Sequence, residues 1–183
     1  MKCEATPLEG VLIITPERRQ DVRGFFAEFY NQRAMREAGV DLTFVQDNYS
    51  LSLAGGTLRG LHFQRPPMAQ AKLIGVVSGA VFDVVVDLRA KSPTYGRHVA
   101  VELSAANGRQ LLAPAGFAHG FCTLDADTRV FYKTTNFYSV AHDAGLAFDD
   151  PALKIDWPVS RETALLSDRD RALPRLAELA PAF

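Results

Sequence analysis

Short apolar runs recur along the whole chain, and glycine, proline, asparagine and aspartate separate them. Residues 81–87 read Val-Phe-Asp-Val-Val-Val-Asp, and this mixture of β-branched and aromatic residues is typical of a strand. Many short strands with frequent turns favour a closed or double-sheet antiparallel fold, such as a jelly roll. The pattern predicts strands at residues 11–15, 24–30, 44–52, 57–64, 71–78, 80–88, 98–103, 110–114, 120–124 and 128–135.

Only short segments have a helical pattern. Asn31 is a suitable N-cap for a helix over residues 32–38, and Gly39 is a suitable residue to end it. Near the end of the chain, residues 161–165 or 171–179 are compatible with short helical turns. The sequence therefore predicts an all-β fold with a few short helices.

The connections indicate how the strands follow one another. Ser78-Gly79-Ala80 links two strand-like runs tightly, which predicts a hairpin turn. No repeat, low-complexity segment or linker divides the chain, so we expect a single domain over residues 1–183. Residues 174–183 contain two prolines and are predicted to form a loosely ordered tail.

Composition and charge exclude several classes of protein. The chain has 20 basic and 21 acidic residues, a net charge of −1, so it has no overall attraction to nucleic acid or to an anionic membrane. No apolar run approaches the ~20 residues of a membrane span, and no signal-peptide core follows the start. Cys3 and Cys122 are far apart and form neither a disulfide framework nor a metal pair. We expect a reduced, cytoplasmic protein.

Two spaced motifs suggest a superfamily. Residues 56–64 follow Gly-x5-His-x-Gln and residues 108–119 follow Gly-x5-Pro-x-Gly-x2-His, which resembles the two halves of the cupin signature. Metal-binding cupins have a second histidine where this chain has Gln64, and a glutamate where it has an uncharged residue. His62 and His119 alone are too few ligands for a catalytic metal site. We therefore expect no metal and no other cofactor.

A longer series of motifs runs through nearly the whole chain. It comprises Asp-Val-Arg-Gly-Phe-Phe-Ala-Glu at 21–28, Gln-Asp-Asn-Tyr-Ser at 46–50, Leu-Arg-Gly-Leu-His-Phe-Gln at 58–64, Gln-Ala-Lys-Leu at 70–73, and further matches at 86–89, 92–96, 114–121, 132–134, 149–151 and 166–170. In this order the motifs resemble those of the dTDP-4-dehydrorhamnose 3,5-epimerase family. The resemblance implies a cupin jelly roll, a homodimer, and a dTDP-4-keto-6-deoxy sugar as substrate in L-rhamnose synthesis.

Epimerisation beside a ketone needs a base, a group that stabilises the enolate oxygen, and an acid on the opposite face of the ring. His62 is the natural base because an imidazole titrates near neutral pH. The resemblance implies that Asp168 orients His62, that Lys72 stabilises the enolate oxygen, and that Tyr132 is the acid. A lone residue of each type is more often structural, so the match to the family decides these assignments.

The resemblance also implies a set of substrate-binding residues. Arginine forks suit phosphate oxygens, and no glycine-rich phosphate loop is present. His119 either hydrogen bonds the sugar or is a buried remnant of the cupin motif. The other implied contacts are Arg23 and Arg59 with the diphosphate, Glu28, Gln46 and Asn48 with the nucleotide and sugar, and Tyr138 stacked on the thymine ring.

Alternatives remain open at the level of sequence. Residues 138–145 and Phe148 depart from the family pattern, which affects contacts at the edge of the pocket. The motifs do not separate a double epimerase from an enzyme that inverts only C3 or C5 of another dTDP-4-keto-6-deoxy sugar. A non-catalytic cupin that binds sugar nucleotides, and more distantly a metal-dependent cupin oxygenase, are alternatives from other classes.

Overall fold

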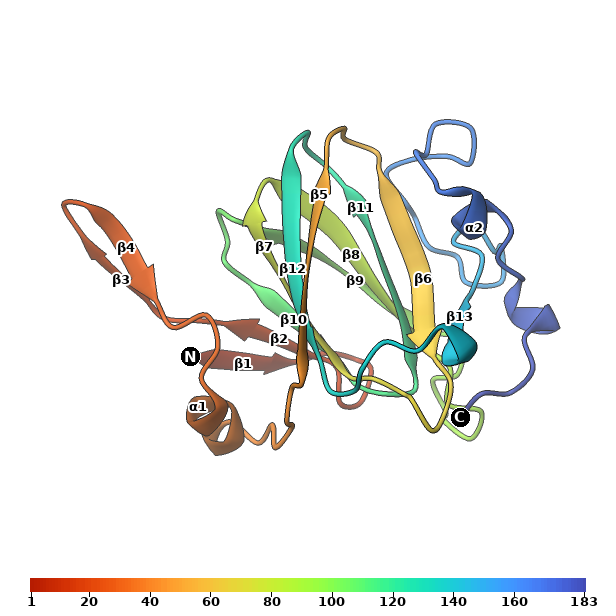
Figure 1. Ribbon diagram of the computed structural model, residues 1–183, viewed down its shortest axis with the longest axis horizontal. Helices are drawn as coiled ribbons and strands as arrows, with labels where there is room; N and C mark the ends of the chain where they lie inside the picture. The colour runs from red at the N-terminus through yellow and green to blue at the C-terminus, as the bar shows by residue number, and fades with distance from the viewer.

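In the computed structural model, which describes residues 1–183, two antiparallel sheets face each other (Figure 1). The six-stranded sheet has the order β1 (Lys2–Ala5), β2 (Leu12–Thr15), β10 (Gln110–Ala113), β7 (Lys72–Ser78), β12 (Thr128–Thr134) and β5 (Gln46–Ser52). The five-stranded sheet has the order β13 (Asp143–Gly145), β6 (Leu58–Gln64), β11 (Phe117–Thr123), β8 (Ala80–Asp87) and β9 (His98–Ser104). The predicted double-sheet, cupin-like fold is confirmed.

A third, two-stranded sheet forms an arm that projects from the sandwich at the left of Figure 1. It consists of β3 (Arg18–Asp21) and β4 (Gly24–Ala27). Each strand predicted from the sequence corresponds to an observed one, although β4 ends before the predicted range does. Strands β1, β3 and β13 were not predicted, because each has only three or four residues and little apolar alternation.

The helices are short, as expected. Helix α1 (Gln32–Glu37) is capped by Asn31, whose side-chain oxygen accepts hydrogen bonds from the backbone N–H groups of Arg33 and Ala34. This confirms the predicted cap. Helix α2 (Asp168–Arg171) and the 3₁₀ turns η1 (Val140–His142) and η2 (Leu176–Glu178) complete the list. No helix of the structure is long and apolar enough to cross a membrane.

The predicted hairpin at Ser78-Gly79-Ala80 is wrong. Strand β7 belongs to the six-stranded sheet and β8 to the five-stranded one, so the chain crosses between the sheets at this link. Gly79 has a φ of +76°, and a Cβ there would collide with the side chain of Thr128. A short link with glycine can form either a hairpin within one sheet or a crossing between two sheets. Which of the two forms depends on how the other strands of the fold pair.

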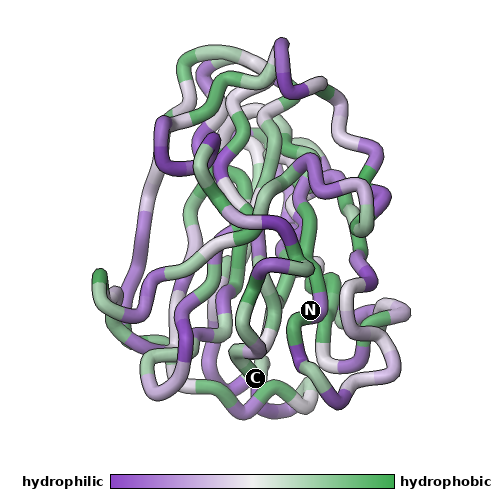
Figure 2. The backbone as a smooth tube through the Cα atoms, turned by 90° about the vertical axis from the view of Figure 1, so that its right-hand side faces the viewer, coloured by the Kyte–Doolittle hydropathy of each residue, from purple (hydrophilic) through white to green (hydrophobic).

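Two apolar clusters flank the five-stranded sheet. One fills the space between the sheets and includes Ile74, Val85 and Phe121. Strand β8 is buried on both of its faces, which explains its nearly continuous apolar run. In Figure 2, hydrophobic and hydrophilic positions follow each other closely along much of the chain, as expected in a protein rich in strands, whose side chains alternate between two faces.

The C-terminal segment covers the outer face of the five-stranded sheet. Leu176, Leu179 and Phe183 pack against the second apolar cluster, which contains Leu61 and Phe63 of β6. The backbone carbonyl of Phe183 accepts a hydrogen bond from Ala90. The prediction that residues 174–183 form a loosely ordered tail is therefore wrong. Two prolines limit regular structure, but the apolar residues between and after them pack on a face of the sheet.

Candidate active site

A cavity of about 560 Å³ opens between the two sheets at the end that helix α2 covers. Strands of both sheets supply its walls, and α2 adds one side. A smaller cavity of about 150 Å³ shares four of its residues, His62, Lys72, Tyr132 and Arg169. The larger cavity is lined by Ser50, Thr57, Leu58, Arg59, His62, Lys72, His119, Phe121, Tyr132, Leu165, Leu166, Ser167, Arg169 and Asp170.

His62 on β6 is paired with Asp170 on α2. Its Nε2 lies 2.5 Å from Oδ1 of Asp170, which is buried, whereas the His62 side chain is partly exposed to the cavity. Burial alone would raise the pKa of Asp170, but the hydrogen bond and charge of His62, with help from Ser167, hold it below its usual range. The carboxylate is therefore ionised at neutral pH and can stabilise a protonated imidazole.

The assignment of Asp168 as the partner of His62 is wrong in this structure. Asp168 is exposed, as the first residue of α2, and makes no hydrogen bond to His62. The hydroxyl of Ser167 caps α2 by accepting from the backbone N–H of Asp170. Two positions along a helix differ by about 200° around its axis, so Asp170 points to the cavity when Asp168 points to solvent. Both acids belong to the same motif, and only the helical turn distinguishes them.

Lys72, at the start of β7, reaches the cavity from the opposite sheet. Its Nζ donates a hydrogen bond to the backbone carbonyl of His62 at 3.1 Å. Burial lowers the pKa of Lys72 to about 8, while the carboxylates of Asp143 and Asp83 oppose that shift. Most Lys72 side chains are therefore still ammonium ions at neutral pH, and they lie next to the base.

Tyr132 lies on β12, directly opposite Ile74 of β7 and Asn48 of β5. Burial raises the pKa of its phenol, and the nearby charge of Arg59 opposes this effect. The hydroxyl is thus protonated at neutral pH and is available as a proton donor. The structure brings the three predicted catalytic groups on the strands, His62, Lys72 and Tyr132, to one cavity.

His119 forms a second histidine–carboxylate pair. It lies opposite His62 in the register of β11 and β6, and its Nε2 is 3.0 and 2.9 Å from the two carboxylate oxygens of Asp83. Asp83 is fully buried, and burial raises its pKa. Asp83 was not identified from the sequence, although an acid inside the apolar run of β8 is a signal that a partner is needed.

The predicted nucleotide contacts Gln46, Asn48 and Tyr138 meet at the smaller cavity. The hydroxyl of Tyr138 donates to Asp143 at 2.8 Å, and the guanidinium of Arg169 pairs with the same carboxylate at 2.7 Å. Neither Asp143 nor Arg169 was identified from the sequence, since their pairing joins β13 to α2. Arg59 lines the larger cavity and donates to Ser52 and to the carbonyl of Leu51.

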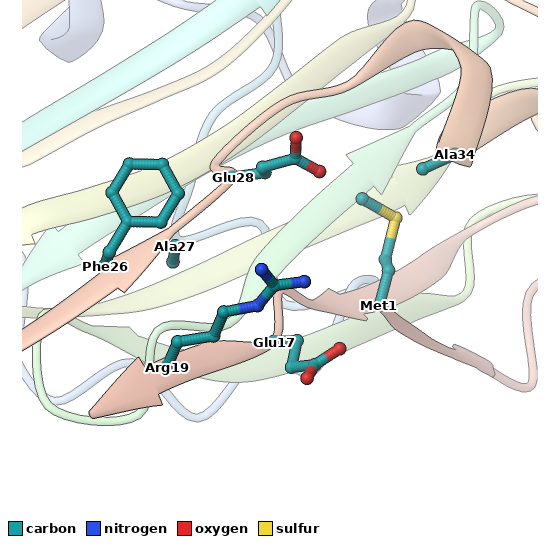
Figure 3. Close-up of a pocket in the computed structure, with 7 residues that line it drawn as sticks. All are labelled: Met1, Glu17, Arg19, Phe26, Ala27, Glu28 and Ala34. Carbon is teal, nitrogen blue, oxygen red and sulfur yellow. The ribbon is translucent and has the colours of Figure 1, made fainter. Parts of the chain in front are cut away.

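Arg23 and Glu28 lie apart from both cavities. Arg23 is exposed near the tip of the arm and pairs with its neighbour Asp21. Figure 3 shows Glu28 with Arg19 and Glu17 in a separate pocket of about 160 Å³, which Met1, Phe26, Ala27 and Ala34 also line. These two predicted contacts are thus not brought to the cavity of their own chain.

The donor groups of the cavity do not form a metal site. No group of three or more histidine, cysteine, aspartate or glutamate side chains is placed to hold an ion. The Nε2 atoms of His62 and His119 each face a carboxylate. The arrangement suits proton transfer, since it combines a carboxylate-supported imidazole with an ammonium ion and a protonated phenol.

Known proteins are similar to this chain over nearly its whole length. The family model described as dTDP-4-dehydrorhamnose 3,5-epimerase matches residues 5–178. The chain belongs to the dTDP-4-dehydrorhamnose 3,5-epimerase family. It is therefore a sugar-nucleotide epimerase, and the resemblance inferred from its motifs is confirmed.

Individual members of the family are similar over almost their full length. The dTDP-4-dehydrorhamnose 3,5-epimerase of Sinorhizobium fredii is 49% identical over 183 residues, which cover 100% of this chain and 93% of that protein. The crystal structure of the Bacillus anthracis 3,5-epimerase, with TDP and PPi bound, has a TM-score of 0.93 at 50% identity and covers 96% and 99% of the two chains. The Legionella pneumophila enzyme in complex with dTDP-4-keto-L-rhamnose has a TM-score of 0.93 at 42% identity, covering 98% and 94%.

Proposed function

We propose that this protein inverts C3 and C5 of dTDP-4-dehydro-6-deoxy-D-glucose to give dTDP-4-dehydro-L-rhamnose, without a cofactor. The observation that carries the proposal is the convergence of His62, Lys72 and Tyr132 on one cavity, with Asp170 supporting His62. A relative that acts on this substrate class is about half identical to the chain over its whole length.

Each inversion would take the same course. The imidazole of His62 removes the proton from the carbon beside the ketone, and Asp170 stabilises the resulting imidazolium. The C–H electron pair moves to the ketone oxygen, where the ammonium group of Lys72 meets the developing negative charge. The phenol of Tyr132 then returns a proton to the carbon from the opposite face. One proton leaves and one is added, so no oxidant or reductant is needed.

The place of Arg23 and Glu28 supports a homodimer as part of the same proposal. Both lie on or beside the arm, which projects away from the sandwich (Figure 1). Phe25 and Phe26 of the arm are 54% and 68% exposed, which is unusual for phenylalanine in a complete structure. We infer that the arm of one protomer reaches the cavity of its partner, where Arg23 would bind the diphosphate.

Mixing two inactive variants tests this arrangement. A His62→Ala protomer and an Arg23→Ala protomer would form heterodimers with one intact site, so unfolding and refolding them together should recover about a quarter of wild-type activity, the binomial expectation for random pairing. If each arm served its own chain, the mixture would be no more active than the Arg23→Ala protein alone.

Proton NMR of the substrate in deuterated water tests the reaction itself. Deuterium that enters at both C3 and C5 with the wild-type protein, and at neither with His62→Ala, is the expected result. Deuterium at one carbon only would indicate a single-carbon epimerase. If the wild type exchanged neither carbon but still bound the nucleotide sugar, the protein would be a non-catalytic binder.

A further inference from the structure

Two buried polar side-chain atoms in the protein have no hydrogen-bond partner, and both lie on β5. They are Nδ2 of Asn48 and Oγ of Ser50. Side chains alternate along this strand, so both residues face inward, toward the cavities. Buried polar atoms in native proteins are nearly always paired, and each exception needs an explanation. Both atoms are therefore available to pair with a molecule that enters the cavities.

A chain of hydrogen bonds fixes which end of the Asn48 amide is free. The backbone N–H of Tyr138 donates to Oε1 of Gln46 at 3.0 Å, so the other end of that amide is Nε2. Nε2 of Gln46 donates to Oδ1 of Asn48 at 2.8 Å, which leaves Nδ2 of Asn48 as an unused donor. Both ends of Gln46 are occupied within the protein. Gln46 is thus a positioning residue for Asn48 and Tyr138.

Ser50 lies two residues further along, where β5 borders the reacting groups. It lines the larger cavity together with His62, Lys72 and Tyr132, whereas Asn48 lines the smaller one. The next inward residue, Ser52, already accepts a hydrogen bond from Arg59. Among the inward residues of β5, Ser50 is therefore the one with an unused hydroxyl beside the catalytic groups.

The chemistry of a hydroxyl narrows the choice of partner. A serine hydroxyl both donates and accepts, which matches another hydroxyl, whereas a phosphate oxygen only accepts. In a dTDP-4-keto-6-deoxy sugar, C1 carries the diphosphate, C4 is the ketone carbon and C6 is a methyl group. The hydroxyls on the ring are at C2 and C3, and the one at C3 changes its direction during the reaction. Only the hydroxyl at C2 keeps its position throughout.

We propose that Ser50 is a specificity-determining residue that exchanges a hydrogen bond with the 2-hydroxyl of the sugar. The inference rests on the proposed function for the identity of the sugar. Such a contact selects against 2-deoxy sugars, because the analogue would leave the serine hydroxyl buried and unpaired. The contact also anchors the sugar ring at C2, whose configuration does not change while C3 and C5 invert.

Binding measured by calorimetry tests the proposal with two ligands that the enzyme cannot turn over, dTDP-glucose and dTDP-2-deoxyglucose. Ser50→Ala should weaken the binding of dTDP-glucose about five- to tenfold, the effect of one neutral hydrogen bond. It should leave the binding of dTDP-2-deoxyglucose within about twofold of wild type. Ser104→Ala is the matched control, since it also removes a buried serine hydroxyl, on β9 outside the cavities.

Two results would overturn the proposal. Equal binding of dTDP-glucose by wild type and Ser50→Ala would mean that water satisfies the hydroxyl. An equal loss for both ligands would mean that Ser50 acts only through the structure of the strand. Failure of the proposed function would give a different result. The wild-type protein would then leave the keto sugar unchanged in the NMR experiment, and calorimetry would still compare the binding of the two ligands.

Discussion

Replacement of Asp170 by asparagine isolates the effect of one charge on the proposed base. The substitution keeps the size of the side chain but removes the carboxylate that lies 2.5 Å from His62 Nε2. Taking the charge centres as about 4 Å apart at an effective dielectric constant of ~20, the carboxylate stabilises an imidazolium by about 4 kcal/mol. A factor of ten in rate corresponds to about 1.4 kcal/mol, so kcat should fall roughly 10³-fold.

The assay is the initial rate of deuterium entry at C3 and C5, followed by proton NMR. Asp168→Asn is the matched control, because it removes the same charge two residues earlier in the chain. The side chain of Asp168 is exposed and does not touch His62. It should retain activity within about threefold of wild type. A loss of less than tenfold in Asp170→Asn, or an equal loss in both variants, would refute the role assigned to Asp170.

Three further predictions concern the acid, the ammonium group and the C-terminal segment. Because the pKa of Lys72 is about 8, kcat/KM should fall above that pH as the ammonium group loses its proton, and Lys72→Arg should remove this alkaline limb. Tyr132→Phe should lower product formation by about 10²-fold or more, while deuterium still enters substrate of unchanged configuration. Phe183→Ala should lower the free energy of unfolding by about 2 kcal/mol, since its ring packs on Phe63.

Each of these has its own check. A pH profile that is flat up to pH 10 would contradict the assignment of Lys72 to the alkaline limb. Parallel loss of exchange and turnover in Tyr132→Phe would argue against a role confined to proton return. For the prediction about Phe183, the free energy of unfolding is measured with denaturant, and Leu53→Ala is the control. Leu53 is exposed, so its replacement should change that free energy by less than about 0.5 kcal/mol. A similar value for Phe183→Ala would restore the prediction of a loose tail.

The pH dependence of stability follows from the same lysine. The folded-state pKa of Lys72 lies below its ordinary value because burial disfavours the ammonium form. The unfolded chain therefore binds more protons between about pH 8 and the ordinary pKa of lysine, and this group makes folding more favourable as the pH rises through that window. The expected loss of activity above pH 8 should consequently not be caused by unfolding of the protein through deprotonation of Lys72.

The sequence by itself determined the strands with a strong apolar pattern and the class of the fold. The run at β8 is β-branched because both of its faces are buried, and β5 alternates because one face lines the cavities. The cap of α1 was equally readable, since a side chain satisfies backbone groups two and three residues away. These features depend on neighbours in the chain, which a sequence displays directly. The candidates on the strands, His62, Lys72 and Tyr132, came from the resemblance of their motifs to those of a known family.

Only the tertiary structure decided which groups meet across long separations. It selected Asp170 instead of Asp168, because the cap at Ser167 sets the rotation of α2 against β6. The tertiary structure also shows that the link at Gly79, predicted to be a hairpin, crosses between the two sheets. Phe183 packs on the outer face of the five-stranded sheet. The fold also placed Arg23 on the exposed arm, outside the residues that line the cavities of its own chain. Each of these outcomes depends on contacts between distant segments, and such contacts have no local pattern from which a single sequence could predict them.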